Sequence, residues 1–269
     1  MRMDNFAQII PLVAQGPALL MTIFRISGIA MMAPFYGAAT VPAQVKIGLS
    51  VIIAFGLWPA LPHTLAMTPT LPGIVVGIVG EMLLGLAIGM AVTILFGGLQ
   101  LAGLAISQQM GISLAEVFDP NFGDTTEVLG TLYYWIGLML FLAIGGHRLL
   151  IGAVLDSFRI IPLGGVAVGP KATGLLVGAL TASMIMAFKM SLPIVLTLFL
   201  TSVSIGLISR TLPQLNIMTA GFALRTTLGL LMGAIMLTAM MRVFLSMIEQ
   251  AMLQLNTTIS GWAGLAPGT

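Results

Sequence analysis

The chain has 269 residues, of which 58% are hydrophobic and only 7% are charged, and its mean hydropathy is +1.11. Because a soluble domain carries about 25% charged residues, this composition excludes an ordinary soluble domain and predicts an integral membrane protein. The net charge of +2 is too small to indicate nucleic-acid binding, and the lack of cysteine excludes disulfides and thiolate chemistry.

Apolar segments of very unequal length make up the first half of the chain. The first, residues 9–34, contains Arg25 and is too long for the apolar part of a cleavable signal peptide. A turn-rich connector, residues 35–46, leads to residues 47–61, which fall short of a hydrocarbon core of about 30 Å. Residues 73–106 form the opposite case, since an unbroken helix of this length would extend about 50 Å. We therefore expect this segment to kink, to tilt strongly or to protrude from the bilayer.

Residues 103–127 combine polar and apolar character in an unusual way. They hold four of the eight acidic residues of the chain and no Lys or Arg, and glycines and Pro120 interrupt them. Apolar side chains such as Met110 and Phe118 nevertheless lie among them. We predict a loop whose apolar side chains are covered by another surface. The alternative is an ordinary connector outside the membrane.

The second half continues with apolar segments. Residues 128–146 are followed by a shorter apolar piece that begins at His147 and ends in SFRIIPLGG. Residues 172–209 are again too long for a simple span, and Pro193 predicts a kink because proline removes a backbone hydrogen bond. Residues 217–248 form the last segment, and a short polar tail is expected after it.

The predicted fold class is all-α and polytopic. The segments lack the period-two alternation of membrane strands. Glycine pairs four residues apart, which let helix backbones approach closely in an apolar medium, recur at Gly73/Gly77, Gly85/Gly89, Gly174/Gly178 and Gly229/Gly233. Six spans with both termini in the cytoplasm would place most Lys and Arg residues inside, as membrane proteins tend to do.

Four charged residues lie within apolar segments, where a central charge costs about 3 kcal/mol or more. They are Arg25, Glu81, Lys189 and Arg225. We consider a conduction path, a proton relay, helix packing and ion pairing between subunits. For Arg25 and Arg225 the alternative is a position near a segment end, with the charge reaching the headgroups. A pair between Glu81 and Lys189 is a further hypothesis.

No enzyme motif is present in the sequence. The only histidines, His63 and His147, are far apart and outside any metalloprotease pattern, and a catalytic metal site needs three converging protein ligands. We therefore predict no catalytic residues, no metal site and no cofactor.

Methionines gather in two groups, at Met184, Met186 and Met190 and at Met232, Met236, Met240 and Met241. Unbranched thioether side chains adapt to varied partners, so one hypothesis is an adaptable gasket around a passing chain. The alternative is that methionine replaces leucine in packed helices.

Several runs of sequence together resemble the FliR family of flagellar export-gate proteins. These are EMLLGLAIGM, LAGLAISQQMGISLAEVFDP, FLAIGGHRLLIGAVLDSFRIIPLG and RTLPQLNIMTAGFALR, with RISGIAMMAPFYG near the N-terminus. The likeness covers nearly the whole chain and is weakest at residues 166–182 and after residue 248. Ala223 stands where the family usually has proline, so the backbone there is expected to differ.

This resemblance implies a non-enzymatic subunit of a type III secretion export gate in the bacterial inner membrane, at the flagellar basal body. Its implied partners are P-type and Q-type gate subunits, other flagellar export-apparatus proteins, unfolded export substrates and membrane lipid, without nucleic acid. The implied architecture is a helical stack of bent, broken helical hairpins around a closed pore.

The resemblance also implies a role for the polar stretch, because the matching family loop projects into the pore and helps to plug it. The implied plug residues are Gln109, Met110, Gly111, Ile112, Leu114, Phe118, Asp119 and Pro120. Gly111 would allow a tight backbone path, and Asp119 and Pro120 would end the loop. The alternatives are a virulence injectisome homologue, which is a close relative, and a secondary transporter with broken helices.

Overall fold

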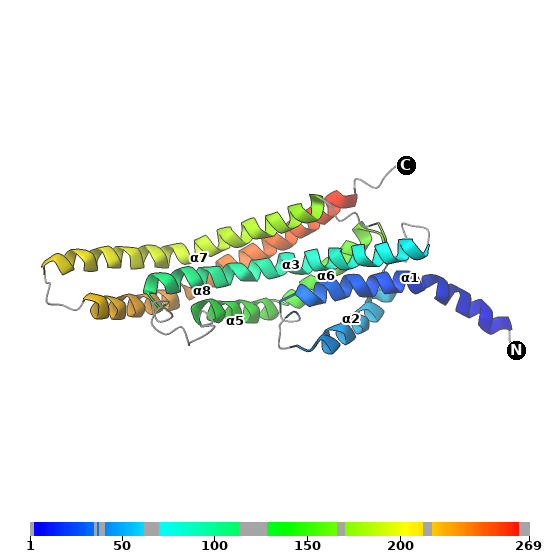
Figure 1. The fold of residues 1–269 in the computed structure, drawn as a ribbon, viewed down its shortest axis with the longest axis horizontal. Helices are drawn as coiled ribbons and strands as arrows, with labels where there is room; N and C mark the ends of the chain where they lie inside the picture. Colours follow the sequence, from blue (N-terminus) through cyan, green and yellow to red (C-terminus); the bar gives the residue numbers. More distant parts are fainter. Residues whose placement is uncertain are drawn as a thin grey trace. The chain divides into compact units, whose positions relative to one another are not determined.

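In a computed structural model, every regular element among the described residues is a helix (Figure 1). The structure describes residues 3–34, 37, 41–61, 70–112, 128–165, 170–211 and 217–263, with only the backbone at 3–14, 170–171, 217–218 and 252–263. The elements are α1 (Met3–Met32), α2 (Ala43–Leu57), the 3-10 turn η1 (Trp58–Ala60), α3 (Leu71–Met110), α5 (Val128–Ala143), α6 (Gly146–Ile160), α7 (Pro170–Thr211) and α8 (Ile217–Ala263). The predicted all-α class is confirmed.

Within the described ranges, four helical stretches are long and apolar enough to cross a membrane. They are Ala43–Ala60, Leu71–Met110, Ala172–Thr211 and Thr219–Ala251. A fifth span is added if α5 and α6, which are bent by 71° at their junction, count as one. Gly145 makes that bend with a left-handed φ of 75°. The polytopic character is thus confirmed, and the six spans expected from the sequence are one or two more than this number.

Two helices continue beyond their predicted ends. The first eight residues of the 103–127 stretch belong to α3, which ends at Met110, because LAISQQM contains good helix formers and no glycine. Helix α8 runs to Ala263, where a polar tail was expected after residue 248. Pro193 lies inside the 42-residue α7, and the kink there stays a prediction.

The chain forms two compact units. Unit 1 comprises Met1–Thr93, Gly145–Leu180 and Ala251–Thr269, and unit 2 comprises Ile94–Ile144 and Thr181–Gln250. Helix α3 therefore contributes its first part to unit 1 and its last part to unit 2.

In unit 1, α1 and α3 touch along their backbones. A Cβ atom added to Gly28 would lie 2.5 Å from the carbonyl oxygen of Met82, and one added to Gly89 would lie 2.7 Å from that of Ile29. At Gly85 it would meet the carbonyl of Arg25. The close packing predicted for Gly85/Gly89 is confirmed.

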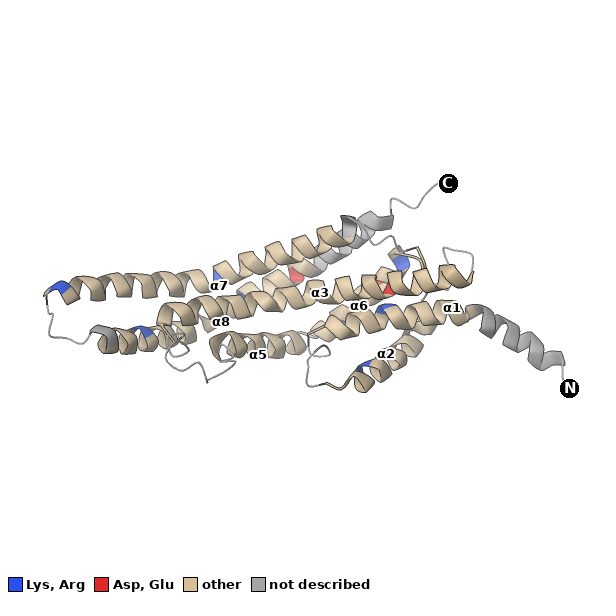
Figure 2. Ribbon diagram, in the orientation of Figure 1, with Lys and Arg blue, Asp and Glu red and all other residues tan. Residues whose placement is uncertain are grey.

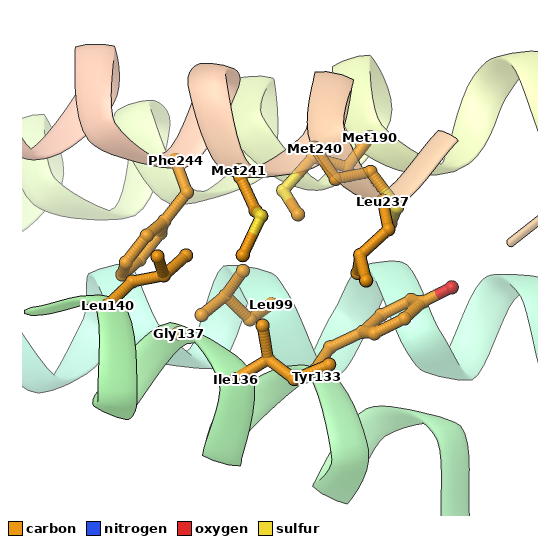
Figure 3. A pocket seen from close by; sticks show the side chains of 10 residues that line it. All are labelled: Leu99, Tyr133, Ile136, Gly137, Leu140, Met190, Leu237, Met240, Met241 and Phe244. Atoms are coloured by element: carbon orange, nitrogen blue, oxygen red, sulfur yellow. The ribbon is translucent and has the colours of Figure 1, made fainter. Parts of the chain in front are cut away.

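The core of unit 2 is aromatic and methionine-rich. The ring of Phe96 makes edge contacts with Phe141 and Phe244, each at 5.5 Å between centroids, a favourable arrangement of aromatic pairs. Side chains from α3, α5, α7 and α8 converge around a small apolar pocket lined in part by Met190 and Met240 (Figure 3). Met186, Met190 and Met240 are buried, so these three methionines pack helices together. Met184 is exposed.

Substituting Gly85 by alanine tests the close contact between α1 and α3. We expect Gly85→Ala to lower stability by about 1–3 kcal/mol, because overpacking forces the two backbones apart. Gly97→Ala, in the same helix with open space around the added Cβ, should be neutral or stabilising by up to about 1 kcal/mol. Thermal melting in detergent-solubilised membranes measures both, and equal melting temperatures would contradict the contact.

Candidate functional site

The most polar buried place in unit 1 is an ion pair. The side chains of Arg25 in α1 and Glu81 in α3 both have 0% exposure, and Arg25 Nε donates a hydrogen bond to Glu81 Oε2. Because the side chain of Arg25 is buried within unit 1, it does not extend out to lipid headgroups. The partner of Glu81 is therefore Arg25, and the proposed pair with Lys189 is wrong. Lys189 lies on an exposed position of α7.

The remaining N–H donors of Arg25 bind backbone carbonyls at the C-terminus of α6. Nη1 donates to the carbonyl of Ser157 at 3.0 Å, and Nη2 donates to the carbonyl of Ile161 at 3.2 Å. The guanidinium also stacks over the ring of Phe158, 4.3 Å from its centroid. The carbonyl of Ser157 also accepts from Ile161 N at 2.9 Å, and the partial negative charge at the C-terminus of a helix favours a cation. Arg25 thus fixes the end of α6 onto α1.

The second oxygen of Glu81 holds the turn that follows α6. The backbone N–H of Gly164 donates to Glu81 Oε1 at 2.9 Å. Gly165 N donates to the carbonyl of Pro162 at 3.0 Å, and Gly164 has a φ of 77°. A positive φ at the third residue is the property of a type II turn, which favours glycine there. The sequence SFRIIPLGG therefore supplies the helix end, the turn and the acceptors for one charged cluster. We call Arg25, Glu81, Ser157, Phe158 and Gly164 the charge cluster.

The other two predicted charges belong to unit 2 and stand outside this cluster. Arg225 is half-buried, and its Nε donates to the carbonyl of Gly221 in its own helix at 3.1 Å. Lys189 is exposed. Charged residues are sparse along all the described helices (Figure 2).

The predicted plug begins at a sharply defined helix end in unit 2. Gly111 has a φ of 84°, and its N–H donates to the carbonyl of Gln108 at 3.1 Å. Ile112 N donates to the carbonyl of Ser107 at 3.2 Å. These two bonds and the left-handed glycine form a Schellman motif. The tight backbone path predicted at Gly111 is thus present.

The plug residues that the structure describes differ in exposure. Met110 is fully buried, and Gln109 and Ile112 are half-buried. Met110 packs against α8 at Gly229. The only signal for this position in the sequence was the spacing of Gly229 and Gly233. Leu114, Phe118, Asp119 and Pro120 lie outside the described residues.

One known protein family matches the part of the chain that contains these features. The pattern of the family described as "Bacterial export proteins, family 1" matches residues 17–251, which include the charge cluster and the end of α3. The chain belongs to this family.

Curated relatives agree with the family assignment. The flagellar biosynthetic protein FliR of Escherichia coli (strain K12) is 32% identical over 216 residues, covering 80% of this chain and 82% of the relative. FliR of Bacillus subtilis (strain 168) is 29% identical over 80% of this chain and 84% of the relative. FliR of Aquifex aeolicus (strain VF5) is 26% identical over 79% and 82%. Together with helices long and apolar enough to cross a membrane, this family assignment makes the chain a flagellar export-apparatus protein of the inner membrane at the flagellar base.

Removing one member of the buried ion pair should destabilise the protein more than removing both. Arg25→Met and Glu81→Leu each leave an uncompensated buried charge, which costs about 3–5 kcal/mol. The double variant loses both charges, so we expect it to recover part of that loss. A double-mutant cycle on thermal melting measures the coupling, and additive losses would contradict a direct pair.

The left-handed backbone conformation of Gly111 predicts a second effect on stability. Gly111→Ala places a Cβ in a left-handed conformation and should cost about 1–2 kcal/mol. Gly111→Asn should cost less, because asparagine adopts this conformation more readily. Melting temperatures that do not follow the order Gly, Asn, Ala would contradict the cap.

Proposed function

We propose that this protein is a non-enzymatic subunit of the flagellar type III export gate and forms, with P-type and Q-type partners, a gated pore for unfolded flagellar proteins. The observation that carries the proposal is the family match over residues 17–251, which takes in the end of α3 and the whole polar stretch after it. The relatives above are flagellar biosynthetic proteins, which favours the flagellar over the injectisome branch.

The apolar surface of the two longest helices supports a place in a larger assembly. Only 17% of the apolar stretch of α7 is buried, and the same fraction of that of α8, whereas 61% of the apolar stretch of α3 is buried. Large side chains such as Phe188 and Leu207 are 67% and 68% exposed. Lipid or apolar partner subunits would cover such exposed faces. A gate subunit in the membrane is expected to contact both lipid and partner subunits.

The plug role rests on where the chain leaves α3. A buried helix end, closed by the left-handed Gly111, directly precedes residues 112–120 in the chain. Their apolar members would seal the pore, and the acidic residues of the stretch would keep its mouth hydrated. Asp119 and Pro120 would end the sealing part.

A secondary transporter is the weaker alternative. Transporters bind substrate or ions through charged groups near the bilayer midplane. In unit 1 the buried charges Arg25 and Glu81 instead bind each other and the backbone of the segment after α6. This pair therefore has little free capacity to bind a solute.

Deleting part of the stretch tests the plug. In a flagellated host that lacks its own FliR, the protein with residues 113–118 deleted should still copurify with its partner subunits. We expect the deletion to raise the resting ion permeability of the inner membrane several-fold over the full chain, because the pore loses its seal. Collapse of a proton gradient in membrane vesicles measures this.

The same host separates the alternatives. Restored swimming with the full chain supports the flagellar branch. An assembled deletion variant with unchanged permeability would contradict the plug. Uptake of small solutes by the purified protein alone in liposomes would favour the transporter.

A further inference from the structure

Unit 1 contains an apolar cleft between α1, α2 and α6. Helices α1 and α2 lie side by side (Figure 1), and α6 completes the walls. All the side chains that line the cleft are aliphatic except that of His147, and they include Ala30 of α1, Leu57 of α2 and Ile151 of α6. About 480 Å³ of space lies between them, part of it open to the surroundings. Ala30 is buried, so its single methyl group leaves room that a longer side chain would fill.

Two basic residues stand where this cleft reaches the start of α6. His147 lines the cleft, Arg148 follows it in the first turn of the helix, and both are exposed. Arg148 and Ile151 are three residues apart, so they lie on the same side of α6. The Cδ atom of Arg148 is 3.7 Å from the place of a Cβ atom on Gly145. The side chain therefore turns back towards the first turn of the helix.

The positive charge at this end of α6 is not neutralised by a described carboxylate. The acidic residue of α6, Asp156, lies two turns further on and pairs with Arg159 at 3.6 Å. Among the described residues, no ion pair is recorded for Arg148 or His147. The partial positive charge of the helix N-terminus adds to that of Arg148. An apolar cleft thus opens beside an unpaired cation.

We propose that this cleft binds an acyl chain of an anionic phospholipid and that Arg148 and His147 bind its phosphate. The site goes beyond the proposed gate function, since it requires neither a pore nor a partner subunit. Guanidinium N–H groups match the geometry of phosphate oxygens, and an imidazole N–H donates as well. Basic pockets between membrane helices bind anionic headgroups in this way.

The chemistry of the cleft and its mouth favours such a lipid over other occupants. A phospholipid joins an apolar chain to a phosphate, as the cleft joins aliphatic walls to Arg148. An apolar side chain of a partner subunit could fill the cleft, but it would leave this cation without an anion. A zwitterionic headgroup would bring its own cation close to Arg148, and like charges repel. A headgroup with net negative charge is therefore preferred.

A tryptophan of the chain itself can report on the cleft. Trp58 directly follows Leu57, and the substitutions Trp135→Phe and Trp262→Phe leave it as the single tryptophan. This full-length protein is reconstituted in phosphatidylcholine vesicles in which a small fraction of the lipid carries brominated acyl chains, which quench tryptophan fluorescence at close range. We expect brominated phosphatidylglycerol to quench Trp58 several-fold more than the same fraction of brominated phosphatidylcholine.

Matched variants test the two halves of the site. Arg148→Gln should abolish the preference for phosphatidylglycerol, and Arg148→Lys should retain most of it. Arg159→Gln removes an exposed arginine from the other end of the same helix and should leave the preference unchanged.

Ala30→Leu fills the cleft and should also abolish the preference. Gly152→Leu adds the same side chain to α6 where a Cβ atom meets nothing within 4 Å, and it should have no effect. Thermal melting identifies variants that fail to fold, and Ala30→Val applies the same change in a smaller step.

Three results would overturn the lipid site. The first is equal quenching by the two brominated lipids in the single-tryptophan protein. The second is an equal loss of preference in Arg148→Gln and Arg159→Gln, which would mean that the charge of α6 attracts anionic lipid without a site. The third is loss of quenching when the protein is assembled with its partner subunits, which would mean that a partner fills the cleft. None of these readouts involves permeability or swimming, so a failure here leaves the proposed function as it stands.

Discussion

The buried pair of Arg25 and Glu81 is the interaction on which unit 1 depends. Desolvating two charges costs several kcal/mol per ion, and a good geometry with further hydrogen bonds is needed to offset it. Here each ion has several partners, since the guanidinium binds a carboxylate, two carbonyls and an aromatic ring, and the carboxylate binds a second N–H. A planar group with five donors suits this role better than an ammonium. The pair thus ties three sequence-distant segments together.

Helix α3 makes close backbone contacts within each of the two units. Helices in lipid gain little from hydrophobic association and depend on tight packing. Glycines provide it at two places along α3, at Gly85 against α1 within unit 1 and at Gly103 against α5 within unit 2. At 40 residues, α3 is about 60 Å long and exceeds a hydrocarbon core of about 30 Å. The sequence-based expectation of an overlong segment therefore holds, and the helix must tilt or extend beyond the core.

Composition and segment length were enough to predict the all-α class, the membrane setting and most helix positions, because these depend on local properties. The plug role of residues 109–120 came from the family resemblance and stays a prediction. The partner of Glu81 could not be predicted, since it lies 56 residues away in sequence and its choice depends on which helices cross. The hypothesis that Lys189 pairs with Glu81 failed for a related reason. A helix that is apolar on all sides has no polar face, so its sequence does not indicate which side is exposed.

The conformation of Gly111 decides where α3 ends. If α3 were to lengthen by one turn, the bond from Ile112 N to the carbonyl of Ser107 would be exchanged for an ordinary helical bond to that of Gln108. One hydrogen bond replaces another, and glycine in a helix interior costs only about 1 kcal/mol relative to alanine. Glycine also moves between left- and right-handed conformations with little strain. The backbone at Gly111 therefore exchanges these two bonds at low cost, and the cap that ends α3 depends on a residue that is free to make either one.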